Sequence, residues 1–167
     1  MVRILSIDPS SNKITTSTTG VVLLDNASVD RYFSVKYGAK NFREWWHSTG
    51  KNLKFDYAIV EKYEARDSDY SRDNTVKQTI DEIKRCIPNV IEQRNAGYAQ
   101  DVPEPLLKKL GMWKFDDKTH HQDIRAAARL GLFWSMRNDI EDVVTDIGLK
   151  LQEQLKWFQK RNFIQSY

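Results

Sequence analysis

The sequence predicts an α/β fold in which a five-stranded mixed sheet, with three antiparallel strands and then parallel strands, is flanked by helices. Short apolar runs separated by turn residues fill the start of the chain. Two further short apolar runs then alternate with longer segments in which apolar residues recur every three or four positions. These patterns are typical of strands and of amphipathic helices respectively. The predicted order is three strands, a helix, a strand, a helix, a strand and then helices.

The first three predicted strands follow one another closely. Val2–Ser10 is a short apolar run that ends on a carboxylate, Asp8, and Thr19–Leu24 and Asp30–Val35 are the second and third runs. Short connections between strands are typical of an antiparallel meander. A carboxylate at the end of a buried strand is costly unless it has a task, such as holding a metal ion or moving a proton.

The middle of the chain is predicted to alternate between helices and strands. Helix Asn41–Leu53 contains Trp45 and Trp46, which we interpret as core residues and not as a platform for stacking bases. Strand Phe55–Glu61 is a second apolar run that ends in an acid. The remaining elements of this region are a charged loop, a helix and a short strand: Lys62–Arg72, Asp73–Ile87 and Asn89–Gln93.

The last part of the chain is predicted to be helical. Loops at Asn95–Pro105 and Trp113–Thr119 flank a short helix, Leu106–Met112. Helix Gln122–Met136 is rich in alanine, which allows close approach to a sheet, and helix Asp139–Phe158 carries an unbroken apolar stripe. We expect that stripe to cover the sheet as core, with a dimer interface as the alternative.

Composition sets limits on the class of protein. The chain has 167 residues, enough for one domain, which we place at 1–167 with a C-terminal helical extension at about 139–161. Its net charge of +3 permits nucleic-acid binding without requiring it. The single cysteine, Cys86, excludes an internal disulfide and is interpreted as a packed thiol. With no signal peptide or membrane-length apolar run, we expect a cytoplasmic protein with no membrane partner.

Acidic residues stand where elements end or begin. Asp8 and Glu61 close two strands, and His120 and Asp123 precede or open a late helix. Carboxylates brought together repel one another unless a cation lies between them, and hard oxygen ligands select Mg²⁺ or Mn²⁺. Two such ions about 4 Å apart activate water and stabilise the leaving oxygen when a phosphodiester is cleaved.

Three segments of the sequence resemble the RuvC-type Holliday junction resolvases, and phage-encoded members in particular. They are ILSIDPS with TTGVVLLD after it, DYAIVEKYEA, and HHQDIRAAARLGLFW, and together they span roughly residues 1 to 137. The resemblance implies a ribonuclease-H-like fold in which the first and fourth strands are neighbours, with the late helix over the same edge. It also implies that Asp8, Glu61, His120 and Asp123 are the catalytic, metal-binding residues, with two Mg²⁺ ions that Mn²⁺ can replace.

The resemblance further implies a homodimer, paired through the predicted helix Asp73–Ile87, that cleaves four-way DNA junctions, in the cytoplasm of a bacterial host if the protein is phage-encoded. Two strands of the junction that are related by two-fold symmetry must be cut, and each chain offers one active site. Two departures stand against a full match. Pro9 and Ser10 follow the first acid where a glycine is common two residues on, and Glu64 occupies the position of an aromatic wedge, with Tyr63 one position earlier. The mechanism of junction opening therefore does not carry over.

Simpler roles compete for each residue. Asp8 could cap a turn, Glu61 could pair with a nearby cation, and Asp123 could favour a helix N-terminus. His121 is interpreted as facing solvent, and Asp117 is the reserve if Asp123 is not a ligand. Nine residues on predicted site-facing loops and helix starts are candidate phosphate contacts: Tyr63, Arg66, Arg72, Lys77, Lys108, Lys109, Lys114, Lys118 and Arg125.

Other functions remain open from the sequence. One alternative is a ribonuclease-H-like nuclease that acts on flap or other branched DNA, and another is a nucleic-acid binder that keeps the fold without cleavage. A sugar-kinase-like ATP-binding fold shares an aspartate after its first strand. That class is disfavoured because only 7 of the 167 residues are glycine and no glycine-rich phosphate loop is present.

Overall fold

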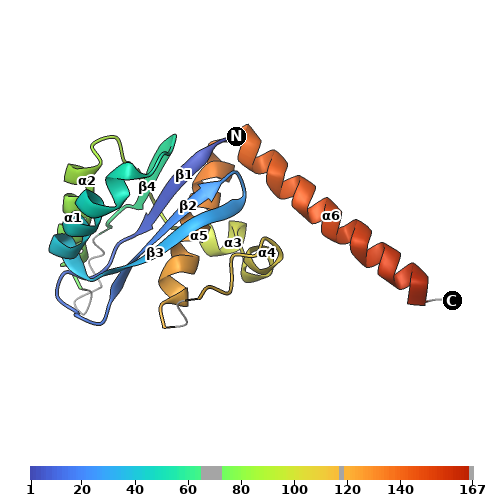
Figure 1. The fold of residues 1–167 in the computed structure, drawn as a ribbon, viewed down its shortest axis with the longest axis horizontal. Coiled ribbons are helices and arrows are strands. Elements are labelled where there is room, and N and C mark those ends of the chain that lie inside the picture. Colours follow the sequence, from blue (N-terminus) through green and yellow to red (C-terminus); the bar gives the residue numbers. More distant parts are fainter. Residues whose placement is uncertain (65–72, 117–118, 166–167) are drawn as a thin grey trace.

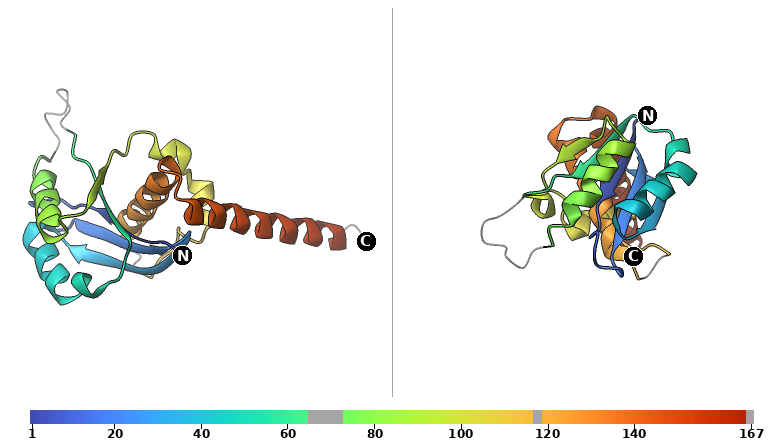
Figure 2. Two further views of the ribbon diagram at one scale, coloured as in Figure 1. Left: turned by 90° about the horizontal axis from the view of Figure 1, so that it is seen from above. Right: turned by 90° about the vertical axis from the view of Figure 1, so that its left-hand side faces the viewer.

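The central feature of the protein is a five-stranded sheet with helices on both faces (Figures 1 and 2). The computed structural model describes residues 1–64, 73–116 and 119–165, with side chains as far as residue 161. The strands are β1 Arg3–Asp8, β2 Thr18–Asp25, β3 Ser28–Lys36, β4 Tyr57–Glu61 and β5 Ile91–Gln93. The helices are α1 Gly38–Ser48, the 3-10 turn η1 Gly50–Asn52, α2 Val76–Cys86, α3 Tyr98–Asp101, α4 Glu104–Lys109, α5 His121–Arg137 and α6 Glu141–Gln165.

The strand order is β3-β2-β1-β4-β5, so the first and fourth strands are neighbours. β1 pairs with β2 and β2 with β3 in antiparallel fashion, whereas β1 with β4 and β4 with β5 are parallel. The predicted mixed sheet is therefore confirmed. Because β1 and β4 run in the same direction, the residues at their carboxyl ends share one edge of the sheet.

Two hydrophobic clusters lie on opposite faces of this sheet. Successive residues of β1 point to opposite sides, so Ile4 joins the cluster under α5 while Leu5 and Ile7 join the one under α1 and α2. Trp45 and Trp46 pack around the latter cluster, in agreement with the core interpretation. Burial on both faces explains why β1 reads as a nearly continuous apolar run.

Glycines allow α5 to lie directly on the sheet. A Cβ atom at Gly20, on β2, would come within 2.2 Å of the Asp123 carbonyl oxygen, and one at Gly131 within 2.9 Å of Leu24 Cδ1. The buried Ser6 hydroxyl also donates to the Ala127 carbonyl at 2.6 Å, which ties the helix to β1. The start of α5 is thus fixed against the strand beside Asp8.

Helix α6 is packed against the body through its first turns, and the Gln154 amide adds a bond to the Lys109 carbonyl further along the helix. Val143 and Ile147 are buried, and the Asp146 carboxylate accepts from the Ala27 backbone N–H at 2.9 Å. Beyond them the helix extends away from the sheet (Figure 1), and Leu155 and Phe158 are 57% and 56% exposed. The expectation that the whole stripe covers the sheet is therefore wrong for its second half.

Smaller differences from the sequence analysis concern short helices and Cys86. The segment expected to be loop at Asn95–Pro105 contains α3 and the start of α4. Burial, with the negative charge of Glu82, raises the pKa of the Cys86 thiol to about 11, so the thiol stays protonated near neutral pH, as expected of a packed residue. Within the described ranges, no helix combines the length and the apolarity that a bilayer crossing requires.

We predict that Gly20→Ala destabilises the protein by about 1–3 kcal/mol, the usual cost of overpacking, because the new methyl group meets the backbone at Asp123. Urea denaturation measures the change. Gly148→Ala in α6 is the control, since a Cβ there has no neighbour within 4 Å and alanine favours helix. Equal stability of the two variants would show that α5 does not depend on this close approach.

Candidate active site

Two carboxylates meet at the edge of the sheet where β1 and β4 end. Ile7 is paired with Val60, so the next residues, Asp8 and Glu61, stand side by side. Their carboxyl groups are close enough to interact, and this contact favours the protonated form of Asp8. The parallel pairing of two strands thus creates the contact that the order of acids in the sequence predicts.

The environment of Asp8 favours its neutral form. Burial, then the negative charges of Glu61 and Asp123, raises the pKa of the Asp8 carboxyl well above its ordinary value, even though the side chain keeps some contact with solvent at the rim. Desolvation and like charges both disfavour ionisation. The influence of Asp123 on Asp8 indicates that all three acids share one region.

The start of α5 is held at this edge by a threonine that follows the first loop. The Thr18 hydroxyl donates to Asp123 Oδ2 at 2.5 Å and lies 3.1 Å from His120 Nδ1. His120 Nδ1 and Asp123 Oδ2 are 3.9 Å apart. Thr18 therefore orients both candidate residues of α5 together.

Residues of the segment after β5 surround Glu61. The Asn95 amide donates to Glu61 Oε1, and the pKa of the Tyr98 hydroxyl is raised by burial and by the charges of Asp8 and Glu61. The Arg129 guanidinium lies 5.4 Å from the centre of the Tyr98 ring. The carboxylates are thus flanked by an amide and a phenol that are themselves held in place.

The loop after Asp8 is anchored by Ser10. Its buried hydroxyl accepts from the Gly38 backbone N–H at 2.9 Å and from the Thr19 hydroxyl at 2.8 Å. These bonds join the end of β1 to β2 and to the first residue of α1. Where the resembled family often has a glycine, this chain uses a hydroxyl to fix the loop.

The donor set suits a hard divalent cation, although the ligands are not gathered around one point. Three carboxylates and one imidazole are the groups near this edge, and oxygen ligands of this kind select Mg²⁺ or Mn²⁺. In the chain as described, no group of three or more His, Cys, Asp or Glu side chains is arranged to hold an ion. Asp8 and Glu61 instead contact each other, so this contact must open before they can share a cation, whereas the Thr18 hydroxyl can stay on one oxygen of Asp123 while the carboxylate binds an ion.

Comparisons with known proteins identify the architecture. No protein-family model and no curated protein matches the sequence. The structure resembles that of T. thermophilus RuvC in complex with a Holliday junction substrate, with 10% sequence identity, a TM-score of 0.58 and coverage of 85% of this chain and 98% of that one. The fold is RuvC-like. A second Thermus thermophilus RuvC structure matches with 11% identity and a TM-score of 0.53, over 82% of this chain and 96% of that one.

The RuvC-like fold confirms the ribonuclease-H-like class predicted from the sequence, and does not distinguish phage-encoded members from others. It also explains why the first and fourth strands are adjacent. At this level of identity the likeness concerns the fold alone. The roles of the four candidate catalytic residues remain predictions, supported by their positions.

The predicted phosphate contacts are in varied surroundings. Lys77 and Lys114 are exposed, whereas Lys109 borders α6. The Tyr63 hydroxyl donates to Asn74 at 2.6 Å. Lys108 is paired with Glu104 at 2.6 Å. Four further residues of the sequence analysis lie outside the described ranges: Arg66, Arg72, Asp117 and Lys118.

Two residues near the start of α5 have internal roles. The Arg125 guanidinium stacks 3.7 Å from the centre of the Trp113 ring, and its Nε donates to the Trp113 carbonyl. His121 is only partly exposed: it packs against Phe115 and contacts Arg125. The interpretation of His121 as solvent-facing is therefore wrong, because the segment before α5 folds over it.

Thr18, Gly20, Asn95 and Tyr98 also belong to the site, although no motif in the sequence marks them. Each acts through a partner distant in the chain, which a local pattern does not reveal. The one available signal was the Asn-Ala-Gly sequence at 95–97, a turn pattern in which Gly97 takes a φ of +85°. That turn places Asn95 and Tyr98 beside Glu61.

We predict that Asp8→Asn stabilises the metal-free protein. A pKa raised by folding contributes stability at low pH, and that stability is lost as pH rises through the folded value. In chelator at neutral pH the melting temperature of Asp8→Asn should exceed that of the wild type by at least ~2 °C, the shift produced by ~1 kcal/mol in a protein of this size. The difference should shrink toward pH ~4, near the ordinary pKa of aspartate.

Asp56→Asn is the matched control, because Asp56 lies just before β4, at its opposite end, and accepts from the Arg3 backbone N–H at 2.8 Å. Losing that charge-assisted bond should leave this variant no more stable than the wild type. A lower melting temperature for Asp8→Asn than for the wild type at neutral pH would contradict the assignment of a strained carboxylate pair.

Proposed function

We propose that this protein is a metal-dependent endodeoxyribonuclease that resolves four-way DNA junctions by two-metal phosphodiester hydrolysis. The observation that carries the proposal is the contact between the Asp8 and Glu61 carboxyls, with the charge of Asp123 beside them, at one edge of a RuvC-like sheet. The RuvC structure that the chain resembles holds a Holliday junction substrate, which supports branched DNA as the substrate class.

The proposed metal ligands are Asp8, Glu61 and Asp123, with His120 as a further ligand or a group that positions water. When bound, two divalent ions would activate water and stabilise the leaving oxygen. The chain itself contributes orientation: Thr18 directs Asp123 and His120, and Asn95 directs Glu61. Metal ligands must be ionised, so a bound cation would have to overcome the raised pKa of the Asp8 carboxyl.

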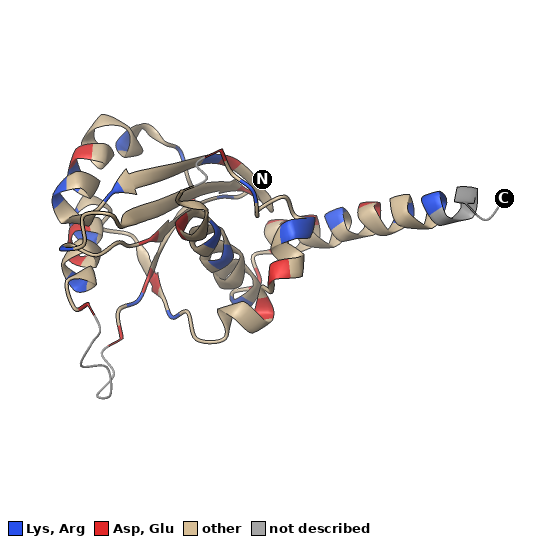
Figure 3. Ribbon diagram, turned by 90° about the horizontal axis from the view of Figure 1, so that it is seen from below, with Lys and Arg blue, Asp and Glu red and all other residues tan. Residues whose placement is uncertain are grey.

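In this proposal, DNA is bound by lysine and arginine side chains that lie outside the carboxylate cluster. Basic residues recur along α5 and on the helices around the sheet (Figure 3). Contacts to phosphates position a duplex, independently of the groups that cleave it. Exposed lysines such as Lys77 and Lys114, and the sequence-predicted Arg66, Arg72 and Lys118, are the proposed contacts.

We predict that Asp8→Asn lowers the cleavage of a synthetic four-way junction in Mg²⁺ by more than about 100-fold, because loss of a metal ligand costs at least as much as loss of an outer-shell partner. Junction binding in chelator should remain within about threefold of the wild type, since phosphates are bound by other residues. Cleavage rates and fluorescence anisotropy measure the two quantities. Retained turnover in Mg²⁺ would remove Asp8 from the mechanism.

The same assay with flap and duplex substrates separates the proposal from its alternatives. Preference for the four-way junction supports resolution, and preference for a flap supports the broader nuclease. Binding without cleavage of any substrate by the wild type, in either Mg²⁺ or Mn²⁺, would identify a non-catalytic binder of the same fold.

We predict a graded series at His120. His120→Ala should lose most cleavage activity, and His120→Asp should retain part of it, because a carboxylate restores an oxygen ligand. His121→Ala is the control, since His121 contacts Phe115 and Arg125 and not the carboxylates. Cleavage rates at fixed Mg²⁺ and again in Mn²⁺ provide the measurement. An inactive His121→Ala with an active His120→Ala would show that the motif is out of register by one.

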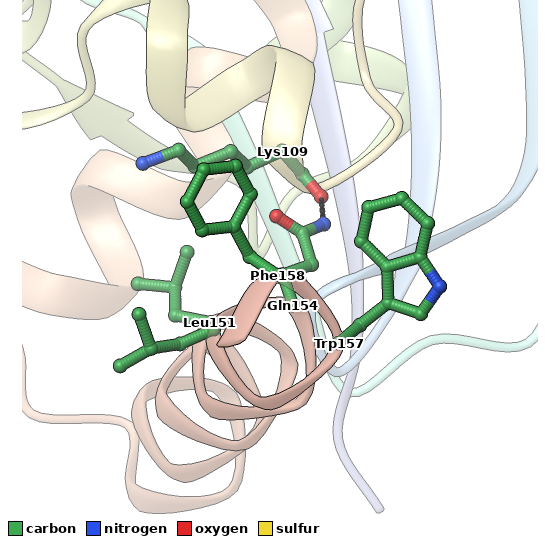
Figure 4. A pocket seen from close by; sticks show the side chains of 6 residues that line it. Lys109, Leu151, Gln154, Trp157 and Phe158 are labelled. Atoms are coloured by element: carbon green, nitrogen blue, oxygen red, sulfur yellow. Dashed lines mark hydrogen bonds between the residues drawn. The ribbon is translucent and has the colours of Figure 1, made fainter. Parts of the chain in front are cut away.

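We also propose a homodimer, because two strands of a junction must be cut and each chain has one site. The second half of α6 offers the surface: Leu151, Trp157 and Phe158 border a cavity of about 600 Å³ with Lys109 (Figure 4). This half of α6 carries Glu153 together with Lys156, Lys160 and Arg161, so antiparallel pairing of two copies brings opposite charges together.

We predict that Phe158→Glu shifts the protein toward monomer in sedimentation velocity at micromolar concentration. The substitution places a charge in the apolar surface that two copies would share. Gln152→Glu, on an exposed position of the same helix, adds the same charge without removing an apolar group and should leave the sedimentation coefficient unchanged. A wild type that is monomeric while it resolves junctions would contradict the symmetric arrangement.

A further inference from the structure

A second pocket opens beside the carboxylates, and most of the residues that border it carry a hydroxyl group. Its volume is about 390 Å³, and it is bordered by the loop between β1 and β2, the end of β3 and the segment before α5. Thr15, Thr16 and Ser17 come from the loop, and Lys36 and Tyr37 come from the end of β3. Its size is at the lower end of the range for small-ligand sites.

The lining of this pocket is suited to an anion. None of the described residues that border it is acidic, and Lys36 contributes a positive charge. Within the described ranges, the Thr15 and Thr16 hydroxyls and the Lys36 ammonium have no hydrogen-bond or ion-pair partner in the protein. Three residues that border the pocket therefore carry donors that no other group of the described protein engages.

The pocket is connected to the candidate active site through shared residues. Thr18 and His120 both border it, and the Thr18 hydroxyl also donates to Asp123 Oδ2 at 2.5 Å. A group bound in the pocket is thus separated from the carboxylate cluster by one side chain. Successive phosphates of a nucleic-acid strand are spaced closely enough to occupy two adjacent sites of this kind.

We propose that this pocket binds a backbone phosphodiester of the DNA strand, next to the one that is cleaved. Lys36 supplies the charge, and the Thr15 and Thr16 hydroxyls supply neutral hydrogen bonds. This inference rests on the proposed function, because the carboxylates define which phosphate is cut. It adds a specific contact that fixes the register of the strand relative to the carboxylates.

The proposal distinguishes the contributions of charge and of hydrogen bonding. A lysine that neutralises a phosphate releases counterions, so its loss reduces the slope of log K against log salt by about 0.9 on duplex DNA or about 0.7 on a single strand. A hydroxyl releases none. Its loss should weaken binding about threefold to tenfold, as expected for one hydrogen bond, at an unchanged slope.

The test measures binding of the full chain to a synthetic four-way junction in chelator, over a series of KCl concentrations. Lys36→Gln should reduce the salt slope by 0.7–0.9, and Thr16→Val should weaken binding without altering the slope. Lys54→Gln is the control, because Lys54 is exposed and precedes β4, at the opposite edge of the sheet from Glu61. It should change neither quantity.

An unchanged slope for Lys36→Gln, or unchanged affinity for Thr16→Val, would overturn the proposal. A wild type that cleaves the junction while Lys36→Gln behaves like Lys54→Gln refutes the pocket and leaves the nuclease standing. The reverse result, a reduced slope in a protein that cleaves no substrate in Mg²⁺, supports the pocket and refutes the proposed function. Titration with inorganic phosphate alone provides the last arm: Lys36-dependent phosphate binding with an unchanged DNA slope would show a simple anion site and overturn the strand contact.

Discussion

The central constraint on this structure is that the fold brings acidic side chains together, at the cost of a raised pKa for Asp8. Two parallel strands end side by side in Asp8 and Glu61, and α5 adds the charge of Asp123. Separate acids on a protein surface would simply be hydrated, but here burial keeps them together. The Asn95 amide orients Glu61 and the Thr18 hydroxyl orients Asp123 without supplying a positive charge, which leaves the site suited to an external cation.

The positions of the three acidic side chains are fixed by packing at some distance from their carboxyl groups. Gly20 removes the side chain that would separate α5 from β2, and the Ser6 hydroxyl binds the helix backbone. On the opposite face, the cluster around Phe42 and Ile83 fixes the same strands from below. Because β1 is buried on both sides, its end cannot shift without disturbing two cores.

The strands of the sheet and the acids at their ends could be predicted from the sequence. The residues that hydrogen-bond to those acids could not. Apolar runs that stop at Asp8 and Glu61 are local patterns, so strand ends could be predicted directly. Thr18 and Asn95 reach their partners across 105 and 34 positions, which no local periodicity records. The stripe of α6 shows the same limit in another form, since amphipathicity indicates that a face is apolar and not which surface covers it.

The attachment of α6 has a mechanical consequence. The helix is fixed to the sheet near Val143 and Ile147 and by the bond between Asp146 and the Ala27 N–H, and its later turns are exposed. A helix rises about 1.5 Å per residue, so Arg161 stands roughly 20 Å beyond Ile147. α6 is in effect a lever: a tilt of a few degrees at its base displaces its tip by an ångström or more. The position of Trp157 and Phe158 is thus set by packing three turns away from them, together with the bond from the Gln154 amide to the Lys109 carbonyl.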